Sequence, residues 1–114
     1  MGWRGHEGLS LIELAVRYFK QRGYKVEKGT DVRELPGEAD LMIRRGRERR
    51  LVWVKDWRRT VGINVIINLD RTSENLGFPG PVIIAEKFSD HARAYASRRG
   101  VKLITKFDMW RRLR

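Results

Sequence analysis

Cysteine is absent from this chain of 114 residues, and histidine occurs only twice. The absence of cysteine excludes disulfide bonds, thiolate metal sites and a cysteine nucleophile. The two histidines, His6 and His91, lie far apart in the sequence and lack the spacing of metal ligands. We therefore assign neither of them a role.

Long hydrophobic runs are also missing. No apolar segment approaches the ~20 residues that a membrane-spanning helix needs, and residues 1–8 lack the apolar stretch of a signal peptide. We therefore expect no membrane association and a cytoplasmic location. Apolar residues make up 41% of the chain, which is typical of a globular protein. We expect residues 1–114 to form a single domain around one core.

Acidic residues are few relative to basic ones. The chain has 14 aspartates and glutamates and 25 lysines and arginines, which gives a formal charge of +11. Such an excess favours a polyanionic partner, and nucleic acid is the commonest one. The alternative is a charged surface that only keeps the protein in solution. With one glutamine and three asparagines, the composition also resembles that of proteins from hot environments.

Helices and strands are predicted to alternate along the chain, which indicates a mixed α/β sheet. Amphipathic spacing predicts helices over residues 8–21, 90–99 and 105–113. Strands are predicted over 24–28, 37–43, 51–57, 82–85 and 101–104. Residues 61–69 are ambiguous, because their apolar residues alternate as in a strand and yet Ile63, Ile66 and Ile67 also suit a helix.

Two consecutive strands form the centre of the predicted fold. They cover residues 37–43 and 51–57, and the basic turn 44–50 joins them. Side chains alternate between the two faces of a strand, so Glu38 and Asp40 are expected to share one face of the first strand.

The second of these strands carries Trp53, Lys55 and Trp57 on one face. When the two strands pair as a hairpin, Asp40 and Lys55 can sit side by side. An acid and a lysine held together at a strand end of a very basic chain suggest phosphodiester chemistry or its remnant. The alternative is a structural salt bridge between the two side chains.

The order of these motifs resembles the PD-(D/E)XK nuclease superfamily, which includes restriction endonuclease-like enzymes and archaeal Holliday-junction resolvases. The resemblance rests on a helix bearing Glu13, the sequence Gly-Glu-Ala-Asp at 37–40, and Val-Trp-Val-Lys-Asp-Trp at 52–57. Residues 81–89 and 100–104 are similar to the strand–helix–strand tail of the restriction-endonuclease branch.

The resemblance covers roughly residues 9–104 and implies an α/β, restriction endonuclease-like fold. Its central mixed β-sheet of about four to five strands is flanked by helices, in the order αβββαβαβ. It also implies a helix over 58–71. We therefore expect a helix there, against the two-residue period of the apolar side chains.

In the superfamily, an aspartate of the first strand and an acid two residues before the lysine bind a divalent cation. The resemblance assigns these roles to Asp40 and Lys55, but Trp53 stands where the second acid should be. Indole cannot ligate a hard metal. Glu38, as a second metal ligand beside Asp40, or Glu13, from the helix, are the candidate replacements. Mg²⁺ is the expected cofactor only if the site is active.

Simpler interpretations exist for some of these residues. Glu13 follows Ser10 by three residues, which also fits a capping box at the start of a helix. Trp53 is either a core side chain or a stacking platform for an unpaired base. The apolar side chains near the end of the chain are interpreted as core residues or as a dimer face, and they are Phe107, Trp110 and Leu113.

Several basic and aromatic side chains are candidates for contacts with a nucleic-acid backbone. The turn contributes five arginines, which a solvated turn would also explain. The full set of candidates is Arg44, Arg45, Arg47, Arg49, Arg50, Trp53, Trp57, Arg58 and Arg59.

These observations support three hypotheses. The chain is a nucleic-acid-binding protein, with DNA as the expected ligand, whose hydrolytic centre is impaired or lost. Alternatively, it is an active Mg²⁺-dependent DNA endonuclease with a replacement acid. The third hypothesis is a non-catalytic interaction module of a repair or ribonucleoprotein complex. Homodimerisation, common in the superfamily, is expected in each case.

Overall fold

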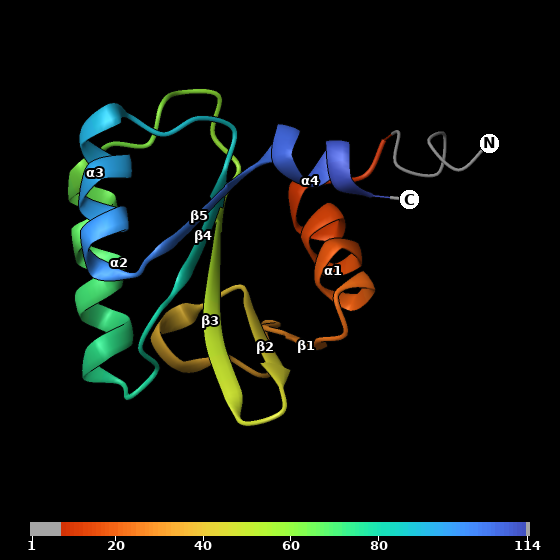
Figure 1. Cartoon of the computed structure of the whole chain (residues 1–114). Coiled ribbons are helices and arrows are strands. Elements are labelled where there is room, and N and C mark those ends of the chain that lie inside the picture. The colour runs from red at the N-terminus through yellow and green to blue at the C-terminus, as the bar shows by residue number, and fades with distance from the viewer. Residues whose placement is uncertain (1–7, 114) are drawn as a thin grey trace.

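A five-stranded mixed sheet organises the computed structural model, which describes residues 8–113 (Figure 1). The strands are β1 (Lys25–Lys28), β2 (Leu41–Arg45), β3 (Glu48–Lys55), β4 (Val82–Ala85) and β5 (Lys102–Thr105). The helices are α1 (Leu11–Gln21), α2 (Ile63–Asn75), α3 (Asp90–Arg99) and α4 (Lys106–Arg112), with a short 3₁₀ helix η2 (Pro36–Glu38). This arrangement confirms the expected α/β class and the nuclease-like order of elements.

The strands lie in sequence order, β1-β2-β3-β4-β5. The first three pair antiparallel, and β3, β4 and β5 pair in parallel. The parallel pairs need crossover connections, which α2 and α3 supply. Helices α1 and α4 cover one face of the sheet, and α2 and α3 cover the other (Figure 1).

Helix α1 illustrates how local sequence fixes an element. Ser10 is its N-cap and accepts a hydrogen bond from the backbone N–H of Glu13, whose carboxylate in turn accepts from the N–H of Ser10. The buried side chains Leu14, Ala15 and Phe19 recur at helical spacing. They pack on the sheet face that also carries the interior side chains of β2 and β4.

The two strands pair as the predicted hairpin, with Leu41 opposite Val52 and Arg45 opposite Glu48, so the pairing extends into the segment 44–50 that was expected to be a turn. Gly46 closes the turn with φ 61°, a conformation that glycine adopts without steric cost. Alternation along β3 sends Val52 toward α1 and its neighbours toward the other face. Both faces of this strand are therefore buried at its centre.

Several predicted boundaries were wrong. The second strand of the hairpin runs from Glu48 to Lys55 rather than over 51–57, so Trp57 lies beyond the strand and does not share its face with Trp53 and Lys55. The first strand of the hairpin begins at Leu41 rather than residue 37, because residues 36–38 turn in η2. The predicted helix 58–71 is confirmed as a helix, but it runs from Ile63 to Asn75. Only one side of this helix is buried, and Ile66 on that side is fully buried against the sheet. Helix α1 starts at Leu11, three residues later than predicted.

The apolar side chains of α4 and of its C-cap residue Leu113 are divided between the core and the surface. Leu113 is buried, whereas 69% of Phe107 and 37% of Trp110 are exposed. The interpretation of Phe107 as a core residue is therefore wrong. Among the residues that the structure describes, no helix is both long and apolar enough to cross a membrane. The expectation about a signal peptide concerns residues that lie almost entirely outside the described part.

Candidate active site and basic hairpin

Asp40 lies between η2 and β2, where it is tied to β3. Its backbone N–H donates to the carbonyl of Val52 over 2.9 Å, and its Oδ2 accepts from the backbone N–H of Val54 over 2.7 Å. The carboxylate is half-buried. One of its two oxygens is therefore already hydrogen-bonded to the residue that precedes Lys55.

Lys55 is the last residue of β3 and is also half-buried. Within residues 8–113, no ion pair joins its amine to the carboxylate of Asp40. Instead the Nζ atom lies 5.5 Å from the ring centroid of Trp57, and the guanidinium of Arg59 lies 4.5 Å from the same centroid. The hairpin thus brings Asp40 and Lys55 to the same end of the sheet, without the salt bridge considered as an alternative.

Trp53 is a core residue, with only 3% of its surface exposed. Its ring packs with Leu35, Ala39 and Leu51, and its Nε1–H donates to the carbonyl of Gly37 over 3.2 Å. A nucleic-acid base could stack on this ring only after those neighbours moved away. Of the two interpretations of Trp53, the core side chain is confirmed and the stacking platform is wrong, because the ring packs the β2–β3 hairpin against its own loop.

The prediction that Glu38 and Asp40 share one strand face was wrong. Glu38 lies at the end of the 3₁₀ helix η2, with φ 55°, and not in a strand. Both residues nevertheless line one cavity of about 220 Å³. Asp31 and Glu34 line the same cavity. The loop before β2 therefore gathers four carboxylates, and nothing in the local sequence pattern predicted the contribution of Asp31 and Glu34.

These carboxylates do not form a metal site as they stand. In the described part of the chain, no three histidine, aspartate or glutamate side chains are arranged to hold a metal ion. Glu13 does not complete a set, because its carboxylate binds the N–H of Ser10 and α1 covers the opposite face of the sheet from Trp53. This hydrogen bond lowers the pKa of Glu13 below its usual value. As they stand, these residues therefore provide only an incomplete set of ligands for a divalent cation.

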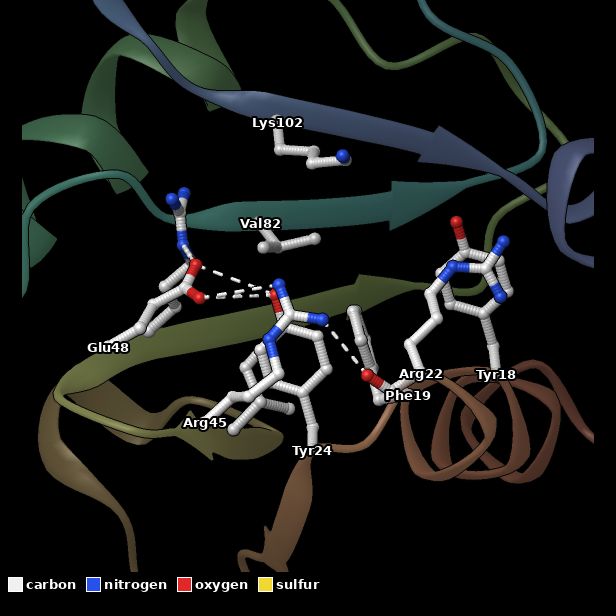
Figure 2. A pocket seen from close by; sticks show the side chains of 10 residues that line it. Tyr18, Phe19, Arg22, Tyr24, Arg45, Glu48, Val82 and Lys102 are labelled. Atoms are coloured by element: carbon white, nitrogen blue, oxygen red, sulfur yellow. Dashed lines mark hydrogen bonds and ion pairs between the residues drawn. The ribbon is translucent and has the colours of Figure 1, made fainter.

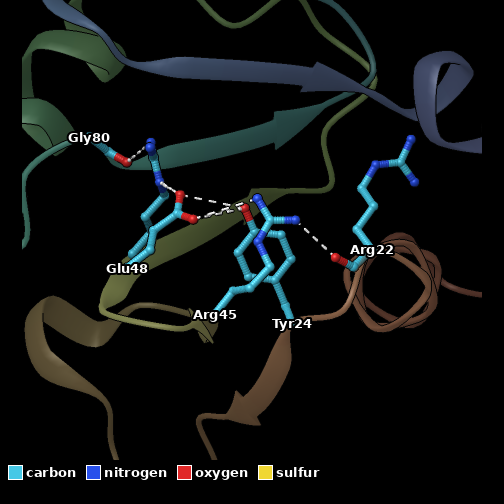
Figure 3. A network of polar contacts seen from close by, with 6 residues as sticks. Arg22, Tyr24, Arg45, Glu48 and Gly80 are labelled. Carbon is cyan, nitrogen blue, oxygen red and sulfur yellow. Dashed lines mark hydrogen bonds and ion pairs between the residues drawn. The ribbon is translucent and has the colours of Figure 1, made fainter.

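The five arginines of the hairpin fall into two groups. Arg45 donates to the carbonyl of Arg22 over 2.9 Å, and Arg50 donates to the carbonyl of Gly80 over 2.9 Å (Figure 3). Arg49 lies 5.0 Å from the ring centroid of Phe78. These three guanidinium groups hold the hairpin against neighbouring segments, and Figure 3 draws the contacts of Arg45 with Arg22 and of Arg50 with Gly80.

Arg44 and Arg47 form the second group. Both are exposed, and no hydrogen bond or ion pair of either side chain is found within residues 8–113. They are thus available to a partner molecule. The fully extended β3 has eight residues, so the turn lies about 23 Å from Lys55 at ~3.3 Å per residue.

A polar network that the sequence did not predict joins α2 to α3. Asp70, 3% exposed, accepts hydrogen bonds from the hydroxyl of Tyr95 over 2.7 Å and from Nε of Arg99 over 3.0 Å. The hydrogen bond to Asp70 raises the pKa of Tyr95. All three residues lie within helices that the sequence predicts, but their pairing depends on how α2 packs against α3, which the sequence pattern does not reveal.

Comparison with solved structures finds the same fold in other proteins, including the following two. A protein of unknown function, AF1548, matches with a TM-score of 0.69 at 21% identity, over 90% of this chain and 56% of that one. A repair endonuclease from Pyrococcus abyssi matches with a TM-score of 0.63 at 15% identity, over 85% of this chain and 46% of that one. The chain thus spans about half the length of either structure. Comparison with curated protein sequences gave no match.

A family model described as restriction endonuclease, Mrr_cat, matches residues 4–113. This match includes the whole sheet, all four α-helices and the loop with the four carboxylates. A nuclease-type protein is consistent with an acid and a lysine at one end of the β2–β3 hairpin. The chain belongs to this restriction endonuclease family.

Proposed function

We propose that this chain binds nucleic acid, with DNA as its ligand, through a nuclease-type fold whose hydrolytic centre is impaired. One observation carries the proposal. Trp53 occupies the position two residues before Lys55 and turns its indole into the core, with Nε1 bonded to the carbonyl of Gly37. The native chain therefore supplies no carboxylate from this position to Asp40.

The chemistry of hard cations supports the impairment. Mg²⁺ prefers six oxygen ligands in nearly octahedral geometry. Asp40 offers a carboxylate of which one oxygen already accepts from Val54. Water and substrate would have to supply most of the remaining ligands, so a cation would be held weakly.

Charge supports the binding of a polyanion. The formal charge of +11 is large for a chain of 114 residues, and binding to nucleic-acid phosphates releases counterions in proportion to the cations used. Arg44 and Arg47 at the turn, and Arg58 after β3, are exposed. These side chains supply phosphate contacts without disturbing the core.

The test is a paired measurement of binding and cleavage on linear and branched DNA, with Mg²⁺ or Mn²⁺. We expect binding that weakens steeply with salt and no cleavage. The double variant Arg44→Gln/Arg47→Gln should lower the slope of log affinity against log salt by about 2. A matched variant, Arg45→Gln, removes a guanidinium that is engaged within the protein. Metal-dependent cleavage that Asp40→Ala or Lys55→Ala abolishes would refute the impairment.

A second function is favoured by one specific observation, the shared cavity of Glu38 and Asp40. In this alternative, the chain is an active endonuclease in which Glu38 replaces the missing acid. Glu38→Gln should then abolish cleavage. Glu34→Gln, which removes one charge from the same cavity, should leave cleavage nearly unchanged. Equal effects of the two variants would indicate a general loss of negative charge rather than a specific ligand.

A further inference from the structure

A second cavity lies at the other end of the sheet, on the face covered by α1. Its volume is about 250 Å³ (Figure 2). The end of α1, the end of β2 and the starts of β3, β4 and β5 surround it. It is lined by Tyr18, Phe19, Arg22, Tyr24, Ile43, Arg45, Glu48, Arg50, Val82 and Lys102. None of these residues belongs to the Asp40–Lys55 end.

The lining of this cavity is strongly cationic. Three arginines and one lysine face a single carboxylate, that of Glu48, so three positive charges remain in excess. Glu48 is held by Arg50, by Arg45 at 3.7 Å and by the hydroxyl of Tyr24 at 3.4 Å. The hydrogen bond with Arg50 lowers the pKa of Glu48. The carboxylate of Glu48 is therefore ionised, and its oxygens already have partners in Arg50, Arg45 and Tyr24 (Figure 3).

Two of the cations are not used by Glu48. The guanidinium of Arg22 stacks on the ring of Tyr18, 3.7 Å from its centroid. Stacking occupies the flat face of a guanidinium and leaves the N–H groups at its edge free to donate. Lys102 extends from β5 over Val82 (Figure 2). Within residues 8–113, neither Arg22 nor Lys102 has a carboxylate partner.

We propose that this cavity binds a phosphate monoester group, with Lys102 and Arg22 as its principal cations. A phosphate dianion matches the excess charge better than a second carboxylate does. Its tetrahedral oxygens accept hydrogen bonds from donors that arrive from different directions, here from β5 and from the end of α1. The volume equals that of about eight water molecules at ~30 Å³ each, enough for a phosphate with part of its solvent.

The site goes beyond the proposed function, because it is separated from Asp40 and Lys55 by the length of β3 and involves neither of them. The phosphate group has two sources of the same chemistry. One is a mononucleotide, and the other is the phosphorylated end of a nucleic-acid strand. Both sources place the same phosphate in the cavity, and they differ in the group that this phosphate carries outside it.

The first experiment titrates the full chain with inorganic phosphate at constant ionic strength and pH 8, followed by calorimetry and by NMR chemical shifts. Lys102→Ala should weaken phosphate binding about tenfold, as expected for one charge-assisted hydrogen bond. The matched control is Lys20→Ala, an exposed lysine on α1 that does not line the cavity. It should change the affinity by less than about twofold, because it contributes only screened charge.

Glu48→Gln provides a test in the opposite direction. Removal of the built-in anion should strengthen phosphate binding, because Arg45 and Arg50 then also face the ligand. A thermal melt of each variant establishes that it is folded. No phosphate binding to the wild-type chain would overturn the proposal. So would equal losses in Lys102→Ala and Lys20→Ala, or weaker binding after Glu48→Gln in a folded chain.

The second experiment distinguishes the sources. AMP is compared with adenosine, and a 5′-phosphorylated oligonucleotide with its 5′-hydroxyl counterpart. A nucleotide site predicts that AMP alone competes with phosphate, and a strand-end site predicts that the phosphorylated oligonucleotide does. In either case Lys102→Ala should abolish the preference, whereas Asp40→Ala should not. Competition by neither compound would refute the monoester assignment. Because inorganic phosphate binding involves no cleavage, its loss is distinguishable from failure of the proposed function.

Discussion

Replacement of Trp53 by glutamate should lower the free energy of unfolding and create affinity for a divalent cation. The indole is 3% exposed and packs with Leu35, Ala39 and Leu51. Removing a buried aromatic side chain costs about 3–5 kcal/mol, and glutamate replaces only part of the volume while bringing a charge that prefers water. We therefore expect a loss of about 4 kcal/mol. A stability of about 5–15 kcal/mol is typical of a domain, so a chain in the upper part of that range stays folded.

A divalent cation should restore part of the folding stability that the glutamate variant has lost, and it should not stabilise the wild type. The new carboxylate would stand beside Asp40, in the arrangement that the family's motif describes. At a free Mg²⁺ or Mn²⁺ concentration about 100 times the dissociation constant, binding to the folded state adds about 2.7 kcal/mol. For a chain of this size, the melting temperature should then rise by about 10 °C. Thermal melts with and without metal measure this shift.

Trp53→Gln is the matched control, since it has nearly the same size and hydrogen-bonding capacity as the glutamate variant but no charge. Its melting temperature should not respond to the cation. Equal responses of the two folded variants would refute the reasoning, because they would show that position 53 does not face a metal site. Metal-dependent cutting by the glutamate variant alone would in addition indicate that the wild-type chain derives from an active nuclease.

Three further measurements address the scaffold. Ser10→Ala should lower the free energy of unfolding by about 1 kcal/mol, because it removes the N-cap of α1; a denaturant titration measures this loss. Asp70→Ala should lower it by about 2 kcal/mol, since two donors lose a buried acceptor while water screens the half-exposed Arg99. The folded-state pKa of Glu13 lies below its ordinary 4.5, so the folded chain holds this proton less tightly than the unfolded chain; the stabilisation is complete above pH 4.5 and is lost as the pH falls. Melting temperatures of the wild type and Glu13→Gln should therefore converge in acid.

The fold was largely predictable because strong local signals agree with it. Ser89 caps the helix that was expected to follow it, Ser10 forms the capping box that its spacing to Glu13 suggested, and Gly100 ends α3 in the left-handed conformation. The order of motifs then located the hairpin that carries Asp40 and Lys55. Local signals of this kind depend on neighbours within a few residues, so the sequence displays them directly.

The site was less predictable because it depends on where the backbone departs from regular structure. Two-residue alternation placed Glu38 beside Asp40 on a strand, but the chain turns through a 3₁₀ helix with Glu38 at φ 55°. Glu38 nevertheless reaches the same cavity by another route. The role of Trp53 likewise depends on the carbonyl of Gly37, sixteen residues earlier. No period in the sequence encodes such contacts.

The distribution of charge along β3 has a consequence for nucleic-acid binding. Carboxylates surround one end of this strand, whereas arginines surround the other, about 23 Å away at ~3.3 Å per residue. A duplex advances ~3.4 Å per base pair, so the exposed Arg44 and Arg47 would contact phosphates about seven base pairs from one held beside Lys55. The acidic end repels a polyanion unless cations are present, and the arginine end attracts it. Affinity should therefore depend on the hairpin arginines more than on Asp40, and neutralising Asp40 should strengthen binding in the absence of divalent metal.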